Sequence, residues 1–202
     1  MGTTKNATRR SVSTIAFDDP RSVWQDKSAK TVAYFCRKPP IKIDGRLLDE
    51  LKRLAARLGG QNVRLCLHES PEAVFHEMII LEHAGKYYRP HKHTAKGESY
   101  HIIEGSLGVI VFDEQGKVED ACVLNPHGPL VYRIGANMYH MILPLSEFVI
   151  YHESKPGPFV RERDSLNPSW APDGGNTAIA ADYVLKLQAA LERERASNDD
   201  VV

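Results

Sequence analysis

The sequence predicts an all-β domain with flanking helices, and three observations lead to that prediction. About nine short runs rich in Val, Ile, Tyr and Phe follow Gly60, and turn-forming residues separate them. A helical pattern of leucines precedes these runs, and a second helical pattern follows them. Many short strands with turns between them favour an antiparallel sandwich or barrel.

Residues 1–40 are predicted to form an N-terminal arm that is partly disordered. The first dozen residues are small and polar, so they lack the apolar surface that would offset the entropy cost of ordering them. Pro39 and Pro40 mark a boundary between this arm and the main domain.

A helix is predicted between Ile43 and Gly60, at the start of a domain that covers residues 41–172. Asp44 is a candidate N-cap, and Gly59 and Gly60 are stop signals. Leucines three or four residues apart form one apolar stripe on this helix. The stripe consists of Leu47, Leu51, Leu54 and Leu58.

The strands are expected at short intervals after this helix. Residues that tolerate a tight or left-handed backbone separate them, as in the turns at 113–116 and 135–137. The predicted strands cover residues 62–68, 74–83, 86–92, 98–104, 107–112, 118–123, 129–134, 138–143 and 147–154.

The chain after the strands is expected to form a loop and then a helix. Residues 154–175 are rich in Pro and Gly and are predicted to wrap the outside of the barrel. Residues 173–202 form a C-terminal unit of helix and tail, in which Ile179, Tyr183 and Leu187 have helical spacing. The apolar face of this amphipathic helix either packs on its own domain or forms a dimer contact.

Charge and cysteine content argue against several classes of protein. The 26 Lys and Arg residues balance 26 Asp and Glu residues, so the chain lacks the basic field of a nucleic-acid-binding protein. Its three cysteines form no CxxC motif, which favours a reducing compartment. No apolar run approaches the roughly 18 residues of a membrane span. We therefore expect a cytoplasmic protein with no nucleic-acid or membrane partner.

Two histidines with one residue between them give the strongest functional signal. His91 and His93 lie on a predicted strand, so their side chains point to the same face. The four residues 94–97 then reverse the chain into a hairpin. In its simplest register Glu98 lies opposite His93 and shares that face. The same register sets Tyr100 opposite His91.

A fourth metal ligand is expected from a distant strand, because three ligands on one hairpin leave one side of an ion open. His140 is the best candidate, since it follows the turn at 135–137 and precedes a short apolar strand. Three imidazoles and one carboxylate suit a divalent transition metal such as Fe, Mn, Ni, Cu or Zn better than Ca or Mg. The ligands do not identify the metal, and an octahedral site with open positions and a closed tetrahedral site both remain open.

These residues resemble the first motif of the cupin family, G-x5-H-x-H-x4-E-x6-G, at every fixed position over residues 85–105. The second motif, P-x-G-x2-H-x3-N, keeps His140 but has Gly135 for the proline, Asn137 for the glycine and Pro144 for the asparagine. Asn and Gly both tolerate a positive φ, so the departure affects the loop geometry more than the ligand.

Within the cupins, the sequence is similar to the WbuC-type metalloproteins over residues 43–172. That resemblance implies a cupin double-stranded β-helix, also called a jelly-roll barrel, with a metal site and a connection to polysaccharide biosynthesis. It does not define a reaction. The resemblance rests on residues 64–68, 88–93, 112–116, 153–159 and 170–172.

Further side chains are candidates for binding or chemistry. Arg64 and His68 match a family pattern and are candidates for binding substrate, against the alternative of surface or interface roles. Arg89 faces inward in the hairpin register, and a buried guanidinium needs an acidic partner or a substrate. Tyr100 and Glu153 are candidate catalytic residues; the alternatives are a packed tyrosine and a salt-bridge partner for an arginine.

Two classes of function compete. The first is a metalloenzyme acting on a small polar molecule such as a sugar or sugar derivative, by isomerase, epimerase or lyase chemistry, or as an Fe(II) dioxygenase. The second is a non-catalytic module that binds a carbohydrate or metabolite with the help of the metal. The enzyme is the preferred class, and the expected partners are a small-molecule ligand and a second copy of the chain, because cupins commonly form homodimers.

Overall fold

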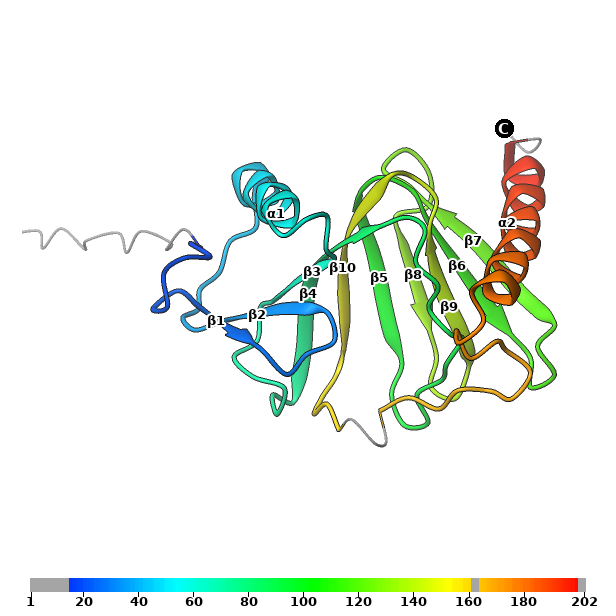
Figure 1. The fold of residues 1–202 in the computed structure, drawn as a ribbon, viewed down its shortest axis with the longest axis horizontal. Helices are drawn as coiled ribbons and strands as arrows, with labels where there is room; N and C mark the ends of the chain where they lie inside the picture. The colour runs from blue at the N-terminus through cyan, green and yellow to red at the C-terminus, as the bar shows by residue number, and fades with distance from the viewer. Residues whose placement is uncertain (1–14, 161–163, 200–202) are drawn as a thin grey trace, which may run out of the picture.

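The computed structural model describes residues 15–160 and 164–199 of the chain (Figure 1). It contains two facing β-sheets and two helices that pack on their outer surfaces. The elements in chain order are β1 (Val23–Asp26), β2 (Val32–Cys36), α1 (Gly45–Arg57), β3 (Val63–Cys66), β4 (Phe75–His83), β5 (Glu98–Glu104), β6 (Leu107–Phe112), β7 (Val118–Leu124), β8 (Val131–Ile134), β9 (Tyr139–Pro144), β10 (Phe148–Pro156) and α2 (Thr177–Asp199).

The seven-stranded sheet has the order β1-β2-β3-β4-β10-β5-β8, and the three-stranded sheet has the order β7-β6-β9. Every strand pairing is antiparallel except β2 with β3, which the connection through α1 makes parallel. The predicted class, an all-β jelly-roll barrel with flanking helices, is confirmed. Eight of the nine predicted strands correspond to β3 to β10.

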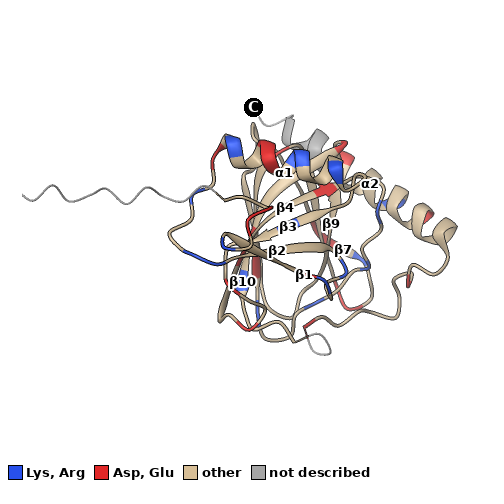
Figure 2. Cartoon of the chain, turned by 60° about the vertical axis from the view of Figure 1, so that its left-hand side comes forward, with Lys and Arg blue, Asp and Glu red and all other residues tan. Residues whose placement is uncertain are grey.

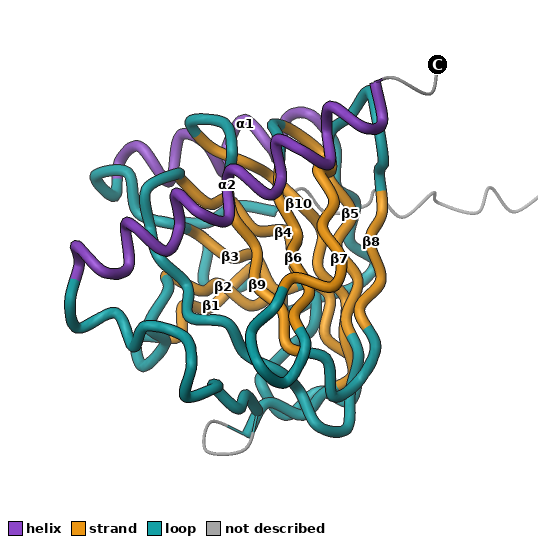
Figure 3. Tube along the Cα trace, turned by 90° about the vertical axis from the view of Figure 1, so that its right-hand side faces the viewer, coloured by secondary structure: helices purple, strands orange, loops and turns teal. Residues whose placement is uncertain are grey.

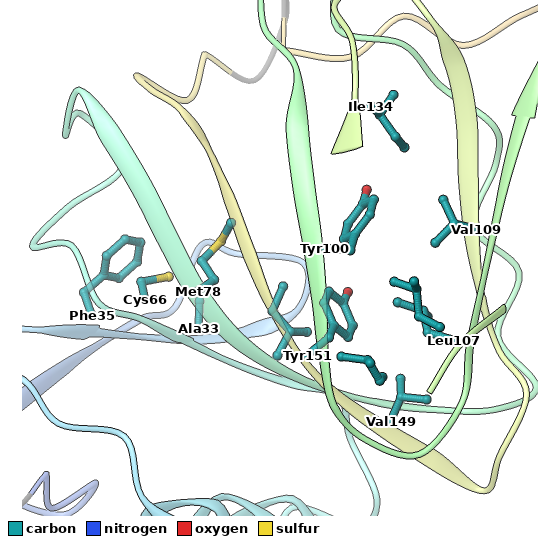
Figure 4. Close-up of a cluster of buried hydrophobic side chains, with 13 residues drawn as sticks. Ala33, Phe35, Cys66, Met78, Tyr100, Leu107, Val109, Ile134, Val149 and Tyr151 are labelled. Atoms are coloured by element: carbon teal, nitrogen blue, oxygen red, sulfur yellow. The ribbon is translucent and has the colours of Figure 1, made fainter. Parts of the chain in front are cut away.

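The interior between the sheets is a closely packed apolar core (Figure 4). Side chains on alternate positions of a strand point to the same face, so every second residue of each strand enters this core. Tyr100 of β5 and Tyr151 of β10 stack edge-on there, with ring centroids 5.8 Å apart. The core is completed by Ala33, Phe35, Cys66, Met78, Ile80, Ile102, Leu107, Val109, Leu124, Ile134 and Val149.

Helix α1 covers the outer face of the seven-stranded sheet. Asp44 caps its N-terminus by accepting a hydrogen bond from the Leu47 backbone N–H at 3.2 Å, as the sequence predicts. The predicted leucine stripe faces the sheet, and Leu51 is 1% exposed against the outward side chains of β4. Acidic and basic residues occupy its solvent side (Figure 2).

Helix α2 crosses the outer face of the three-stranded sheet (Figure 3). Leu187 and Leu191 are 5% and 1% exposed and pack against Ile110 and Met141. The helix approaches the sheet so closely that a Cβ on Gly108 would lie 2.5 Å from Leu191 Cδ1. Of the two alternatives, the structure therefore shows the helix packing on its own domain.

The segment expected as a leading arm contributes strands to the barrel. β1 and β2 form a hairpin at the edge of the seven-stranded sheet, and Phe35 enters the interior core. These strands have only four and five residues, too short for a clear alternation of apolar and polar side chains. The predicted disorder of the first dozen residues lies outside the described residues.

The strand predicted at 86–92 is wrong, and so is the hairpin register derived from it. Both sides of β5 are already paired, with β10 and with β8, so no edge is left for residues 86–92. Pro90 also lacks the N–H that a ladder needs. Only His91 and Lys92 form isolated bridges, to His140 and to Leu166.

Candidate metal centre

The four predicted metal ligands meet at one end of the barrel, although they come from three separate segments. His91 and His93 lie in the loop before β5, Glu98 is the first residue of β5, and His140 is the second residue of β9. One nitrogen or oxygen atom from each lies within 4.8 Å of the others. His93, Glu98 and His140 are at most 2% exposed. Both sheets therefore supply ligands to a site that is almost closed to solvent.

Backbone hydrogen bonds fix the loop that carries two of the ligands. The His91 N–H donates to the His140 carbonyl at 3.0 Å, and the His140 N–H donates to the His91 carbonyl at 2.9 Å. The Asn137 N–H donates to the His93 carbonyl at 2.7 Å. Asn137 has φ of 62°, the left-handed conformation for which the second cupin motif uses glycine. The asparagine therefore preserves the turn that places His140.

Two of the imidazole rings are held from behind by backbone carbonyls. His140 Nδ1 lies 2.8 Å from the Met138 carbonyl, and His93 Nδ1 contacts the Asp164 carbonyl. A carbonyl only accepts, so each Nδ1 must carry the proton and donate it. Each Nε2 then faces Glu98, and in the neutral ring this nitrogen carries the lone pair that a metal-binding histidine needs.

The contact between His140 and Glu98 tests whether a cation fits here. His140 Nε2 lies 2.6 Å from Glu98 Oε1, yet it is buried and makes no hydrogen bond within the described part of the chain. A neutral imidazole nitrogen and a carboxylate oxygen at this separation repel each other, unless a proton on the ring or a metal cation places a positive charge between them. Burial, followed by the neighbouring His140, lowers the pKa of His91 to about 3, so its ring is neutral and able to bind a metal. The donor set therefore fits a divalent transition metal.

Lys155, which the sequence analysis did not single out, neutralises the carboxylate of this site. Its Nζ lies 3.3 Å from Glu98 Oε2 and 2.8 Å from Glu153 Oε1. Burial alone would raise the pKa of Glu98, but Lys155 and the two histidines hold it well below its usual range. The available signal was the spacing in Glu98-x-Tyr100 and Glu153-x-Lys155, which puts each pair on one face of its strand.

The two candidate catalytic residues lie beside this carboxylate. The Tyr100 hydroxyl donates to Glu98 Oε1. Glu153 is paired directly with Tyr100 across β10 and β5, and it is 8% exposed. The structure thus brings both residues to the centre and gives the Tyr100 hydroxyl a buried acceptor.

The three candidate substrate-binding residues, Arg64, His68 and Arg89, do not gather around the metal ligands as the two candidate catalytic residues do. Arg64 lies on the inner face of β3, with Nη1 4.0 Å from Met78 Sδ. His68 stacks on His76 at a centroid distance of 4.2 Å, and burial lowers its pKa to about 4. Arg89 donates from Nη2 to the Pro168 carbonyl at 2.6 Å and faces the segment after β10, not the ligands, so the inward orientation derived from the hairpin is wrong.

The convergence of ligands decides the fold type. A motif in the loop before β5 and a second motif at the start of β9 supply the ligands at one mouth of a two-sheet barrel. The fold is therefore a jelly-roll barrel of the cupin type. A model for a domain of unknown function, DUF6016, matches the chain at residues 43–124, which is less than half of the chain. Comparison with curated proteins gives no match.

Several solved structures are similar to part of the chain at low sequence identity. The capsular polysaccharide assembling protein CapF from Staphylococcus aureus is 13% identical over 54% of this chain and 30% of its own, with a TM-score of 0.45. Oxalate decarboxylase from Bacillus subtilis is 17% identical over 53% of this chain and 27% of its own, with a TM-score of 0.42. The cupin domain of Schizosaccharomyces pombe Cnp3 is 18% identical over 47% of this chain and 64% of its own, with a TM-score of 0.37. The matched region thus spans less than a third of CapF or of the decarboxylase.

The helices were also compared with the requirements of a membrane span. Neither α1 nor α2, the helices of the described residues, is long and apolar enough to cross a bilayer.

Proposed function

We propose that this cupin binds one divalent transition metal through His91, His93, Glu98 and His140 and is a metalloenzyme acting on a small polar molecule such as a sugar or sugar derivative. The observation that supports this most strongly is the convergence of one ligand atom from each of these four residues within 4.8 Å of one another, with three of the residues at most 2% exposed. Burying four such donors together is costly unless a cation binds among them.

The neighbouring residues suit proton transfer beside the ligands. When bound, a divalent metal would act as a Lewis acid that polarises a carbonyl or hydroxyl oxygen. Glu153 forms an ion pair with Lys155 at 2.8 Å, and Lys155 also contacts Glu98, so the Glu153 carboxylate is a candidate base close to the ligands. The Tyr100 hydroxyl donates a hydrogen bond to Glu98. Because that proton is already engaged, we assign Tyr100 the role of orienting the Glu98 carboxylate. Proton removal and return by Glu153 would support isomerase, epimerase or lyase chemistry.

Two alternatives share the same ligands. In the first, the protein is a non-catalytic module that binds a carbohydrate or metabolite. This alternative is favoured because the sequence has no recognisable catalytic motif beyond the ligands. In the second, iron is the native metal and the protein is an Fe(II) dioxygenase. The identity of the bound metal separates this second alternative from Lewis-acid chemistry with zinc.

The test is elemental analysis of protein purified without added metal. We expect about one equivalent of Fe, Mn, Ni, Cu or Zn in the native chain and a loss of that metal in His91→Ala. His101→Ala is the matched control, because His101 is an exposed histidine on β5. No metal in the native chain, even after reconstitution, would refute the proposal, as would retention of the full equivalent in His91→Ala.

The homodimer and the cytoplasmic location stay predictions. The mass of the protein in solution tests the first, and fractionation of cells tests the second.

A further inference from the structure

Charged side chains share the inner face of the seven-stranded sheet with the apolar core. Arg64 pairs with the core residue Ile80, and Glu153 pairs with the core residue Tyr100. Directly opposed residues, and residues two positions apart on a strand, lie on the same face. The charged residues placed on this face by those two rules are Asp26 of β1, which is opposed to the core residue Ala33, Arg64 of β3, Glu82 of β4, Glu98 of β5, and Glu153 and Lys155 of β10.

Without a metal, the charges on this face are slightly negative. The cations Lys155 and Arg64 balance two of the three carboxylates Asp26, Glu98 and Glu153. Burial, followed by the charge of Glu153, raises the pKa of Glu82 to about 7, so this carboxyl carries at most part of a charge at neutral pH. Its Oε2 is buried and has no hydrogen-bond partner in the described part of the chain, which agrees with a carboxyl that is largely protonated.

Two further carboxylates beside the barrel, Asp164 and Glu104, do not alter this balance, because each has its own cation. Asp164, beside His93, is paired with Lys96. Glu104, at the end of β5, is paired with Lys52 of α1 at 3.1 Å.

A divalent metal at the four ligands would therefore leave this face with an excess of at most about one positive charge, which one carboxylate would neutralise. Uncompensated charge in a buried site is unfavourable, and a ligand of opposite charge relieves it. A neutral sugar brings no such compensation, whereas an organic acid does.

The position of Lys155 indicates where the anion would be recognised. Its Nζ lies 3.3 Å from a ligand oxygen of Glu98, so it is adjacent to the place where a metal-dependent ligand binds. An ammonium has three N–H donors. Glu98 and Glu153 are its two ion-pair partners in the described residues, and its side chain is 14% exposed, so one donor is available to an incoming oxygen.

We propose that the ligand of this site is a small organic acid, sugar acids included, whose carboxylate is bound by Lys155. This rests on the metal binding proposed above, and it narrows the substrate class from polar molecules in general to anions. Because the metal supplies the excess charge, metal and anion should each strengthen the binding of the other.

The experiment compares glycerate with glycerol, which share a three-carbon skeleton but differ in the carboxylate. Isothermal titration calorimetry is performed on Mn²⁺-loaded and on metal-free protein. We expect glycerate to bind the loaded protein at least about tenfold more tightly than glycerol does, since a hydrogen bond to a charged group contributes roughly 1.5–3 kcal/mol. We also expect glycerate to bind the metal-free protein more weakly than the loaded protein.

Variants of Lys155 identify the recognising residue. Lys155→Met should weaken glycerate binding by about tenfold or more, yet leave Mn²⁺ binding as tight or tighter, because the competing ammonium is gone. Lys155→Arg keeps the charge and should keep glycerate binding. Lys186→Met removes a lysine that is 73% exposed on α2 and should match the native chain.

Several results would overturn the inference, and they differ from a failure of the proposed function. Equal binding of glycerol and glycerate by the loaded native chain refutes an anionic ligand, and this comparison needs no variant. Native glycerate affinity in a folded Lys155→Met refutes the role of Lys155. If Mn²⁺ does not bind the native chain at all, both the proposed function and the inference fail.

Discussion

His140 Nε2 and Glu98 Oε1 lie 2.6 Å apart, and the His140 ring is oriented for this contact by the hydrogen bond from Nδ1 to the Met138 carbonyl. The two residues come from different sheets, so their contact spans the mouth of the barrel. A metal cation at this point would bind both atoms and so join the two sheets.

The first prediction concerns the carboxylate ligand. Glu98→Gln keeps the shape of the side chain but removes its charge. We expect metal affinity to fall by about 100-fold or more, because mutating even the residues that hydrogen-bond to metal ligands typically lowers metal affinity about 10–100-fold. Calorimetric titration with Zn²⁺ measures the change. Glu119→Gln, at an exposed position of β7, should bind Zn²⁺ as the native chain does. Unchanged affinity in Glu98→Gln would remove this residue from the ligand set.

The second prediction concerns the coupling of metal binding to stability. A metal that binds only the folded chain adds about 2.7 kcal/mol at a concentration of 100 times its Kd. For a chain of this size that raises Tm by about 5–10 °C, at about 2–4 °C per kcal/mol. Differential scanning fluorimetry with and without Zn²⁺ measures the shift, and a chelator should reverse it. The same rise in His140→Ala would mean that the metal stabilises the protein from another site.

These ligands could be predicted from sequence, whereas their geometry could not. The spacing of His91, His93 and Glu98 is local, so it is visible in a short stretch of sequence. The actual neighbours of β5 are β8, which pairs with Glu98, and β10, which begins 50 residues after Glu98, and no local pattern reveals either pairing. The hairpin register failed for this reason, although the ligands that it brought together do meet.

Lys155 and the first hairpin illustrate a different limit. A lysine near the end of a strand usually lies at the surface, and only the pairing of β10 with β4 and β5 turns this one toward Glu98. Likewise, β1 and β2 gain their stability from pairing with β3, which lies beyond a whole helix in the chain. Long-range pairing, not local propensity, decides both cases.

The third prediction uses the buried carboxyl of Glu82. Its pKa is about 7 in the folded chain against an ordinary value of 4.5 for a glutamate in water, so the folded state holds a proton that the unfolded state releases. Stability due to this group is therefore lost as pH rises from about 4.5 to about 7, to a total of about 3 kcal/mol. Glu82→Gln should remove that loss and be more stable than the native chain at pH 8, but not at pH 4.5.

Urea unfolding at several pH values checks this, with exposed Glu147→Gln as the control. The quantity to compare is the difference in unfolding free energy between the variant and the native chain at each pH. This difference is needed because His68 contributes a pH dependence of the opposite sign. Burial lowers its pKa to about 4, so its contribution to stability is lost as pH falls from about 6.5 to about 4. A difference between Glu82→Gln and the native chain that does not change with pH would show that Glu82 is ionised throughout.

The fourth prediction tests how firmly α2 is attached to the barrel. Leu191 is 1% exposed and packs over Gly108, so Leu191→Ala leaves a cavity that should cost about 2–5 kcal/mol of unfolding free energy. Leu185, on the same helix, is 64% exposed, and Leu185→Ala should change stability by less than about 0.5 kcal/mol. Chemical denaturation measures both. If the two variants lose equal stability, α2 is held by its exposed side as well, and a second copy of the chain is then the partner to look for.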